Sequence, residues 1–168
     1  NINYKFIPPK ITDITQITEK MIDDLGKEKL LVLEKSIEFI KENSERGPIY
    51  LIAHNGNSFD FIILKKLINE YNLKYNDAPI ENRILNRFKY IDTVLLSKLF
   101  LEEERVNQPG LCKRYNIKND SEHRALGDVN ALEKLYIKLC SQYSYKKNYD
   151  RNYYLENPLK IIEDCLIN

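Results

Sequence analysis

The chain has 168 residues, of which 43% are hydrophobic and 30% are charged, and its formal net charge is +1. This length is sufficient for one domain with a hydrophobic core, and the small net charge neither favours nor excludes a nucleic-acid partner. The widely spaced Cys112, Cys140 and Cys165 match neither a zinc motif nor a disulfide framework. Since no apolar run is long enough to span a bilayer, we expect an intracellular protein, in the cytoplasm or nucleus, with reduced thiols.

The first elements along the chain are short. Residues 4–7, YKFI, predict a strand that ends at two prolines, and the Ile/Thr alternation that follows predicts an extended stretch. Thr18 is placed to cap a helix over residues 19–25. Residues 27–42 predict a longer amphipathic helix. Its apolar face carries Leu30, Leu33, Ile37 and Ile40.

Strands and helices alternate in the middle of the chain. Residues 49–53, IYLIA, are uniformly apolar and predict a central strand that is covered on both faces. A helix over about residues 59–71 follows, and residues 88–92 predict a second strand that leads into a helix from residue 93. His54 and Asn55 are expected to shape the turn between the first strand and its helix. This alternation predicts an α/β sheet.

Residues 110–116 predict a short helix, and residues 124–142 predict the last long one. The remainder, residues 143–168, is rich in Tyr, Lys and Asn. We interpret it as a loose tail with a short helix near its end; a contact with nucleic acid is an alternative. The predicted organisation is therefore one domain over residues 1–142 and a tail over residues 143–168.

Two aspartates stand at matching places in this pattern. Asp60 and Asp128 each precede the apolar stripe of a predicted helix, so both carboxylates are expected to point toward the edge of the core. Two carboxylates brought together repel unless a cation lies between them, and oxygen ligands suit Mg²⁺ or Mn²⁺. His123, five residues before Asp128, is placed to take a proton from a water molecule. The alternative is that each aspartate only caps its helix.

Four stretches of the sequence, taken in order, resemble the DEDDh 3′→5′ exonucleases. AHNGNSFDFIIL, which contains Asp60, resembles their second motif, and HRALGDVNAL, which contains His123 and Asp128, resembles their third. ITQITEKMI resembles the substrate-contacting segment between the first two motifs, and YIDTVLLSKL resembles the strand-to-helix passage between the second and third. The wording of these motifs leans toward the three-prime repair (TREX-like) branch of the family.

The resemblance implies an α/β fold of the RNase H-like type, with a mixed sheet flanked by helices. It also implies two divalent ions, Mg²⁺ with Mn²⁺ as the alternative, held by four carboxylates. Carried over by position, Asp60 and Asp128 match metal ligands and His123 matches the general base. Ile14 and Phe59 match positions that press on the terminal nucleotides, and the alternative for both is packing in the core.

The implied function is removal of nucleoside 5′-monophosphates from the 3′ ends of single-stranded DNA, with no membrane partner. One alternative is an RNA-trimming exoribonuclease of the same family. A second is an inactive member that only binds nucleic acid, and a third is a structural or interaction domain in which both aspartates are caps.

The family's first motif, Asp-x-Glu on the first strand, has no counterpart at the start of this chain, which begins at Asn1 with what corresponds to the third strand. We therefore expect a fragment of a longer exonuclease. The alternatives are a degenerate member or a first strand that another chain supplies. From these 168 residues alone we expect little or no metal-dependent nuclease activity.

Overall fold

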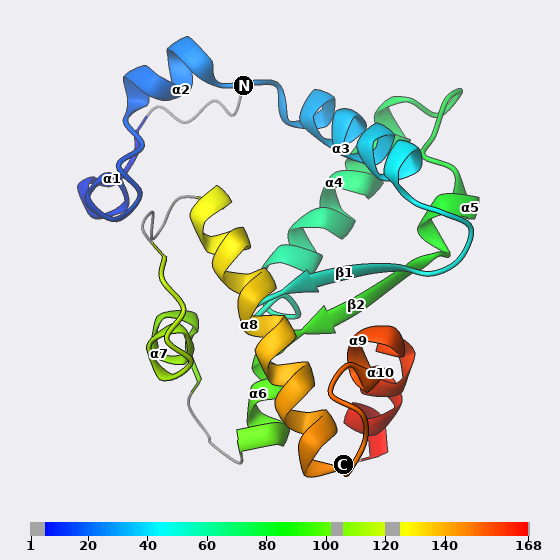
Figure 1. Cartoon of the computed structure of the whole chain (residues 1–168). Helices are drawn as coiled ribbons and strands as arrows, with labels where there is room; N and C mark the ends of the chain where they lie inside the picture. The colour runs from blue at the N-terminus through cyan, green and yellow to red at the C-terminus, as the bar shows by residue number, and fades with distance from the viewer. Residues whose placement is uncertain (1–5, 102–105, 120–124, 168) are drawn as a thin grey trace. The chain divides into compact units, whose positions relative to one another are not determined.

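The computed structural model describes residues 6–101, 106–119 and 125–167, which form a mostly helical α/β structure with a small sheet (Figure 1). The N-terminal half contains α1 (Pro9–Thr15), α2 (Glu19–Leu25), α3 (Lys29–Asn43), β1 (Ile49–Ala53), α4 (Asp60–Lys74) and α5 (Asn82–Leu85). The C-terminal half contains β2 (Phe88–Asp92), α6 (Thr93–Leu101), α7 (Gln108–Arg114), α8 (Ala125–Lys146), α9 (Tyr153–Glu156) and α10 (Pro158–Ile167).

The chain divides into two compact units. Unit 1 consists of Asn1–Ile49 and Ile63–Phe88, and unit 2 consists of Tyr50–Ile62 and Lys89–Asn168. Unit 1 therefore contains α1, α2, α3, α5 and most of α4. Unit 2 contains nearly all of both strands together with α6 to α10.

In unit 1, α3 buries Leu30, Leu33 and Ile37 as its apolar spacing predicts. The expected helix over residues 19–25 is also present, and the Thr18 hydroxyl accepts a hydrogen bond from the Met21 backbone N–H at 3.2 Å.

Two expectations for unit 1 are wrong. Residues 6 and 7, the described part of the expected strand at 4–7, are not in a strand. The Ile/Thr stretch is not extended but begins in α1. Pro9 at the start of this helix needs no N–H partner, and Gln16 closes it in the left-handed conformation at φ 57°. Local helix signals at both ends therefore override the alternating pattern.

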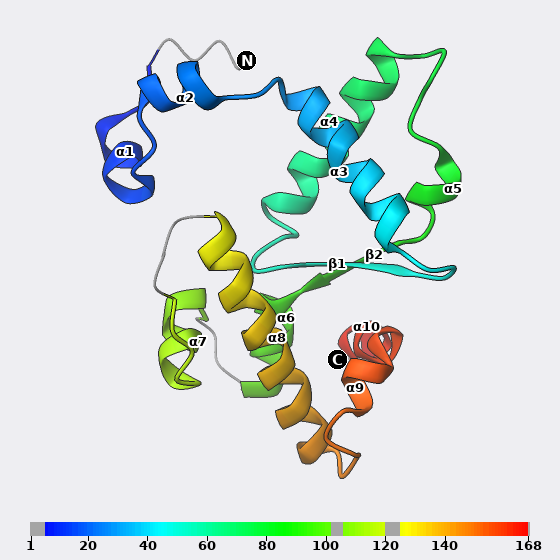
Figure 2. The ribbon, with the colours of Figure 1, turned by 45° about the horizontal axis from the view of Figure 1, so that its top comes forward.

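The expected strands at residues 49–53 and 88–92 are β1 and β2, which pair with each other and run in the same direction (Figures 1 and 2). Within the described residues β1 has β2 as its one strand neighbour, and its first four residues are only half-buried. The prediction that β1 is central and covered on both faces is therefore wrong for the structure described. A uniformly apolar strand can be buried on both faces, but its sequence does not say which polypeptide covers it.

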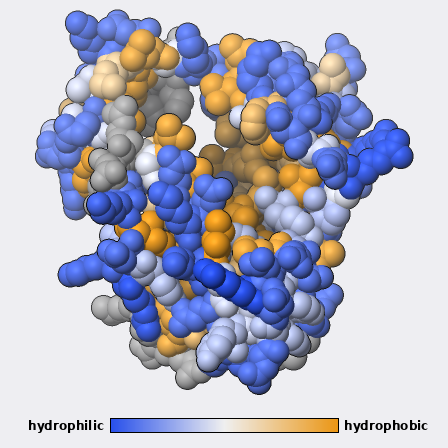
Figure 3. Space-filling view, in the orientation of Figure 1, coloured by the Kyte–Doolittle hydropathy of each residue, from blue (hydrophilic) through white to orange (hydrophobic). Residues whose placement is uncertain are grey.

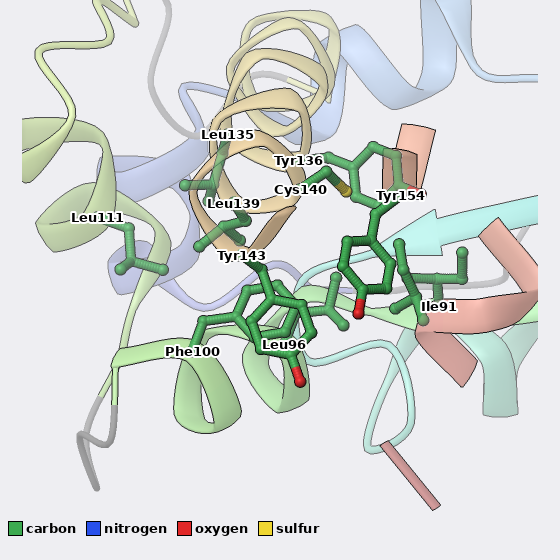
Figure 4. Close-up of a cluster of buried hydrophobic side chains, with 11 residues drawn as sticks. Ile91, Leu96, Phe100, Leu111, Leu135, Tyr136, Leu139, Cys140, Tyr143 and Tyr154 are labelled. Atoms are coloured by element: carbon green, nitrogen blue, oxygen red, sulfur yellow. The ribbon is translucent and has the colours of Figure 1, made fainter. Parts of the chain in front are cut away.

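Unit 2 takes its core from α8. Side chains over the C-terminal half of this helix are mostly hydrophilic on the face in Figure 3. Its other side packs into a cluster with α6, α7, α9 and α10 (Figure 4). The fully buried side chains of the cluster include Leu96, Leu135, Leu139, Cys140, Tyr154 and Ile161.

The expectation of a loose tail is wrong. Residues 143–146 continue α8, and the Tyr143 ring stacks on Phe100 at 3.8 Å between centroids. Tyr154 is 0% exposed, and its hydroxyl donates a hydrogen bond to Asp164 at 2.5 Å. The expected helix near the end is present as α10. The tyrosines that suggested an unstructured segment are core residues. The proposed boundary of the exonuclease domain at residue 142 stays a prediction.

Candidate active site

The turn from β1 to α4 carries Phe59 and Asp60, and its shape depends on Asn55 and Gly56. Asn55 is left-handed at φ 65°. The Gly56 carbonyl accepts hydrogen bonds from the N–H groups of Phe59 at 3.2 Å and Phe61 at 2.9 Å. A Cβ on Gly56 would lie 2.6 Å from the Phe61 ring and 2.7 Å from Cβ of Ala53. Glycine is therefore required here for close packing.

Asp92, at the end of β2, holds this turn from the neighbouring strand. Its carboxylate is 6% exposed. Oδ1 accepts from the backbone N–H groups of Asn55 and Val94, both at 2.9 Å, and Oδ2 accepts from that of Asn57 at 3.0 Å. A buried carboxylate is stable when N–H groups saturate it in this way. Asp92 therefore fixes the turn, which agrees with leaving it out of the candidate site.

His54 supports the same turn. Its Nδ1 lies 2.9 Å from the hydroxyl of Thr93, which is fully buried. The same hydroxyl lies 3.3 Å from the Ala53 carbonyl, to which it donates, so Thr93 connects the His54 ring to the end of β1. Burial lowers the pKa of His54, and the charge of Asp92 and the backbone of Val106 oppose this shift. His54 and Asn55 thus shape the turn, as expected.

Asp60 is the first residue of α4, and its side chain is exposed, not at the core edge where the helical spacing placed it. Phe59 beside it is 62% exposed, so the alternative of core packing does not apply to this ring. The turn thus exposes both an aromatic ring and a carboxylate to solvent.

Asp128 lies in the first turn of α8 and is half-buried. Its Oδ1 accepts a hydrogen bond from the Asn119 side-chain amide at 2.9 Å, and its backbone carbonyl accepts one from Gln108 Nε2 at 2.8 Å. These two amides were not recognised as site residues from the sequence. Asp128 stands at the rim of a pocket of about 280 Å³. The pocket is lined by Gln108, Pro109, Cys112, Lys113, Ile117, Asn119 and Asp128.

Comparison with known proteins identifies the family to which these residues belong. The profile of the exonuclease family represented by RNase T matches residues 3–136, most of the chain. The chain belongs to this exonuclease family. It is a DEDDh-type 3′→5′ exonuclease domain of the RNase H-like superfamily, as the four motifs predicted.

Several curated relatives of this exonuclease are bacterial polymerases. The chain is 32% identical over 139 residues to DNA polymerase III PolC-type of Mycoplasma genitalium, which covers 79% of this chain. It is 31% identical over 136 residues to the same enzyme of Mycoplasma pneumoniae and 30% over 143 residues to that of Clostridium perfringens, which cover 77% and 84% of it. The matched region is 8% of the length of each polymerase. The lean toward the three-prime repair branch stays a prediction.

Exonucleases of this kind generally use divalent metal ions, and the described residues supply only part of such a site. Asp60 and Asp128 both belong to unit 2. Among the described residues, no group of three or more His, Cys, Asp or Glu side chains is placed to hold a metal. The described part of the exonuclease therefore does not form a complete two-metal site.

The remaining predicted site residues are distributed differently. Ile14 is 41% exposed on α1 in unit 1. His123 lies outside the described residues, as does a triplet with the Asp-x-Glu pattern at residues 120–122. That triplet follows the second motif instead of preceding it. None of the helices in the described part of the chain has the length and apolar character that a membrane crossing requires.

Proposed function

We propose that this exonuclease removes nucleoside 5′-monophosphates one at a time from the 3′ end of single-stranded DNA. DNA is favoured over RNA because the curated relatives at about a third identity are named as DNA polymerases. The proposed cofactor is Mg²⁺, as two ions, with Mn²⁺ as a substitute.

The observation that carries this proposal is the setting of Asp128. A half-buried carboxylate in the first turn of a long helix is held by the Asn119 amide at the rim of a pocket. An aspartate that only caps its helix needs neither the hydrogen bond from Gln108 to the Asp128 backbone carbonyl nor a pocket beside it. A fixed carboxylate beside an accessible cavity is the arrangement that a divalent ion and a phosphate require.

In the proposed site, Asp60 and Asp128 are two of the four carboxylate ligands. His123 is the general base that accepts a proton from the attacking water, and Phe59 and Ile14 contact the terminal nucleotides. The exposed Phe59 ring supports its part of the proposal, since unstacked bases pack on aromatic faces. The two remaining carboxylates would come from the family's first motif, Asp-x-Glu on the first strand, and not from the described residues.

The test is trimming of 3′-labelled single-stranded DNA and RNA, with Mg²⁺ or EDTA, by the protein made from its own gene and by residues 1–168. Asp60→Asn, Asp128→Asn and His123→Ala should each abolish Mg²⁺-dependent trimming. Glu133→Gln is the matched control, because Glu133 is exposed on α8 five residues after Asp128. Unchanged trimming by Asp128→Asn would overturn the proposal, and faster trimming of RNA would make the enzyme an exoribonuclease.

A further inference from the structure

A second concave surface lies farther along α8 in unit 2. It is a pocket of about 380 Å³, bounded by α8, by the residue after α7 and by the turn that follows α8. The residues that matter here are Tyr115, Lys138, Gln142, Tyr145, Tyr149 and Arg151. We call these six residues the tyrosine–cation surface.

Two tyrosine rings of this surface are accessible, and one of them also packs against the protein. Tyr145 is 83% exposed and Tyr149 is 44% exposed. The Tyr149 ring packs on Tyr153 at 4.2 Å between centroids, and its backbone N–H donates to Ser144 at 2.9 Å. One face of Tyr149 is thus used for packing while the ring remains partly open to solvent.

The tyrosine–cation surface also joins two elements. The Tyr115 hydroxyl donates to the Gln142 side chain, which connects the end of α7 to α8. Exposed aromatic rings on a fixed scaffold lose little conformational entropy when a planar ligand stacks on them.

The charged members of the surface are both cations. Lys138 and Arg151 are exposed, and within the described part of the chain neither forms an ion pair with a carboxylate. Asp150, beside Arg151, accepts a hydrogen bond from the Asn152 N–H at 2.9 Å and does not line the pocket. Rings for bases and cations for phosphates together match the chemistry of a single-stranded polynucleotide.

We propose that the tyrosine–cation surface binds the single strand several nucleotides before its 3′ end. The proposal rests on the proposed function, because it places the terminal nucleotide near Asp128. Tyr145 follows Asp128 by 17 residues on α8, which corresponds to a rise of about 26 Å along the helix. Both pockets include α7 or the residue that ends it, so one strand lying along α7 and α8 meets both.

The first test measures binding of single-stranded DNA to the full chain carrying Asp128→Asn, so that no trimming interferes. Oligonucleotides of about 4 and about 16 nucleotides span the site sizes of such platforms. With Lys138→Glu and Arg151→Glu together, affinity for the longer strand should fall at least about tenfold. The slope of log affinity against log salt should become shallower by about 1.4, since two phosphate contacts are lost. Affinity for the shorter strand should not change.

The matched control is Lys66→Glu together with Arg83→Glu. Both residues are exposed in unit 1, and the two substitutions change the net charge by the same amount. It should leave the ratio of the two affinities as it is. Equal losses in both double variants would show a general effect of charge and overturn the proposal.

The second test concerns the rings. Tyr145→Ala should weaken binding of the longer strand about tenfold, and Tyr145→Phe should restore it because the ring still stacks. If neither the charge variant nor Tyr145→Ala weakens the longer strand, the surface is not a nucleic-acid site and a protein partner becomes the next candidate. Such a result would leave the proposed function intact, which fails separately if Asp128→Asn still trims DNA.

Discussion

Asp92 and Asp128 are both carboxylates of unit 2, and they differ in their surroundings. Asp92 is buried at the end of β2, where three backbone N–H groups reach its two oxygens. Asp128 is half-buried at the rim of a pocket, and the side chain of Asn119 reaches one of its oxygens. The first carboxylate is enclosed by the chain's own backbone, while the second remains accessible from a cavity.

The contrast distinguishes a carboxylate that stabilises the fold from one that is available for the reaction. Three backbone N–H groups donate to Asp92, so the local fold depends on this carboxylate. Asp128 is oriented by side chains and can still be reached by a ligand. We therefore expect Asp92 to matter for stability and Asp128 for trimming.

The largest expected effect is on stability. Asp92→Ala removes the buried carboxylate to which three backbone N–H groups donate and should lower the free energy of unfolding by about 3 kcal/mol. Asp128→Ala should lower it by less than about 1 kcal/mol, because the site is half-open to solvent. Urea denaturation followed by circular dichroism measures both. Equal losses in the two variants would remove the distinction between them.

A substitution at Gly56 tests the close packing of the same turn. Gly56→Ala places a methyl group against the Phe61 ring and Ala53, which should cost about 2 kcal/mol of unfolding free energy. Phe61→Leu in the same chain should recover part of that loss, because it removes the atoms that the new methyl group meets. A double-mutant cycle by urea denaturation gives the coupling. Purely additive losses would mean that Phe61 is not the obstacle.

The helices that carry the two motif aspartates could be predicted from sequence, because each has a local signal. Apolar residues at helical spacing predicted α4 and α8, and the strand predicted over residues 88–92 led into a helix from residue 93, where α6 begins. The four motifs also gave the family, which the match over residues 3–136 confirms.

The parts that were missed depend on contacts between distant residues. Asp92 binds Asn55 and Asn57 across 37 and 35 positions of the chain. Asn119 reaches Asp128 from a loop that has no periodicity, and Tyr154 is buried only because α8 and α10 enclose it. No window of neighbouring residues contains that information. The same limit explains why a tyrosine-rich segment was interpreted as a loose tail.

Asn119 provides the corresponding test on the Asp128 side. Partners that orient a metal ligand are typically worth about 10-fold to 100-fold in metal affinity or activity. Asn119→Ala should therefore reduce kcat/KM for 3′ trimming about tenfold, or about 1.4 kcal/mol. The Mg²⁺ concentration for half-maximal rate should rise, while the urea midpoint stays within a few tenths of a molar unit of the parent's.

A merely structural role for Asn119 would have the opposite signature. The urea midpoint would fall and the Mg²⁺ dependence would keep its shape. Asn119→Ser, which retains a shorter donor, should give an intermediate Mg²⁺ requirement if the hydrogen bond to Oδ1 is what orients Asp128.

His54 gives the smallest effect and returns to the turn held by Asp92. Burial lowers its pKa below the usual 6.5, so the native state holds the neutral ring more strongly than the unfolded state does. Well above pH 6.5 both states are neutral and His54 contributes no pH dependence. As the pH falls through that value, His54 binds a proton in the unfolded chain but not in the native one. The free energy of unfolding therefore decreases until the pH reaches the lower native pKa.

The matched variant is His54→Asn, whose side chain can still form a hydrogen bond with Thr93 from a similar position. It removes the titration but keeps the hydrogen bond. Between about pH 8 and about pH 5, the unfolding free energy of the parent should therefore fall relative to that of His54→Asn. Other titrating groups are common to both chains and cancel in this difference. If the difference is the same at both pH values, His54 is protonated as easily in the folded protein as in the unfolded one, and the turn around Asp92 is more open to water than its hydrogen bonds indicate.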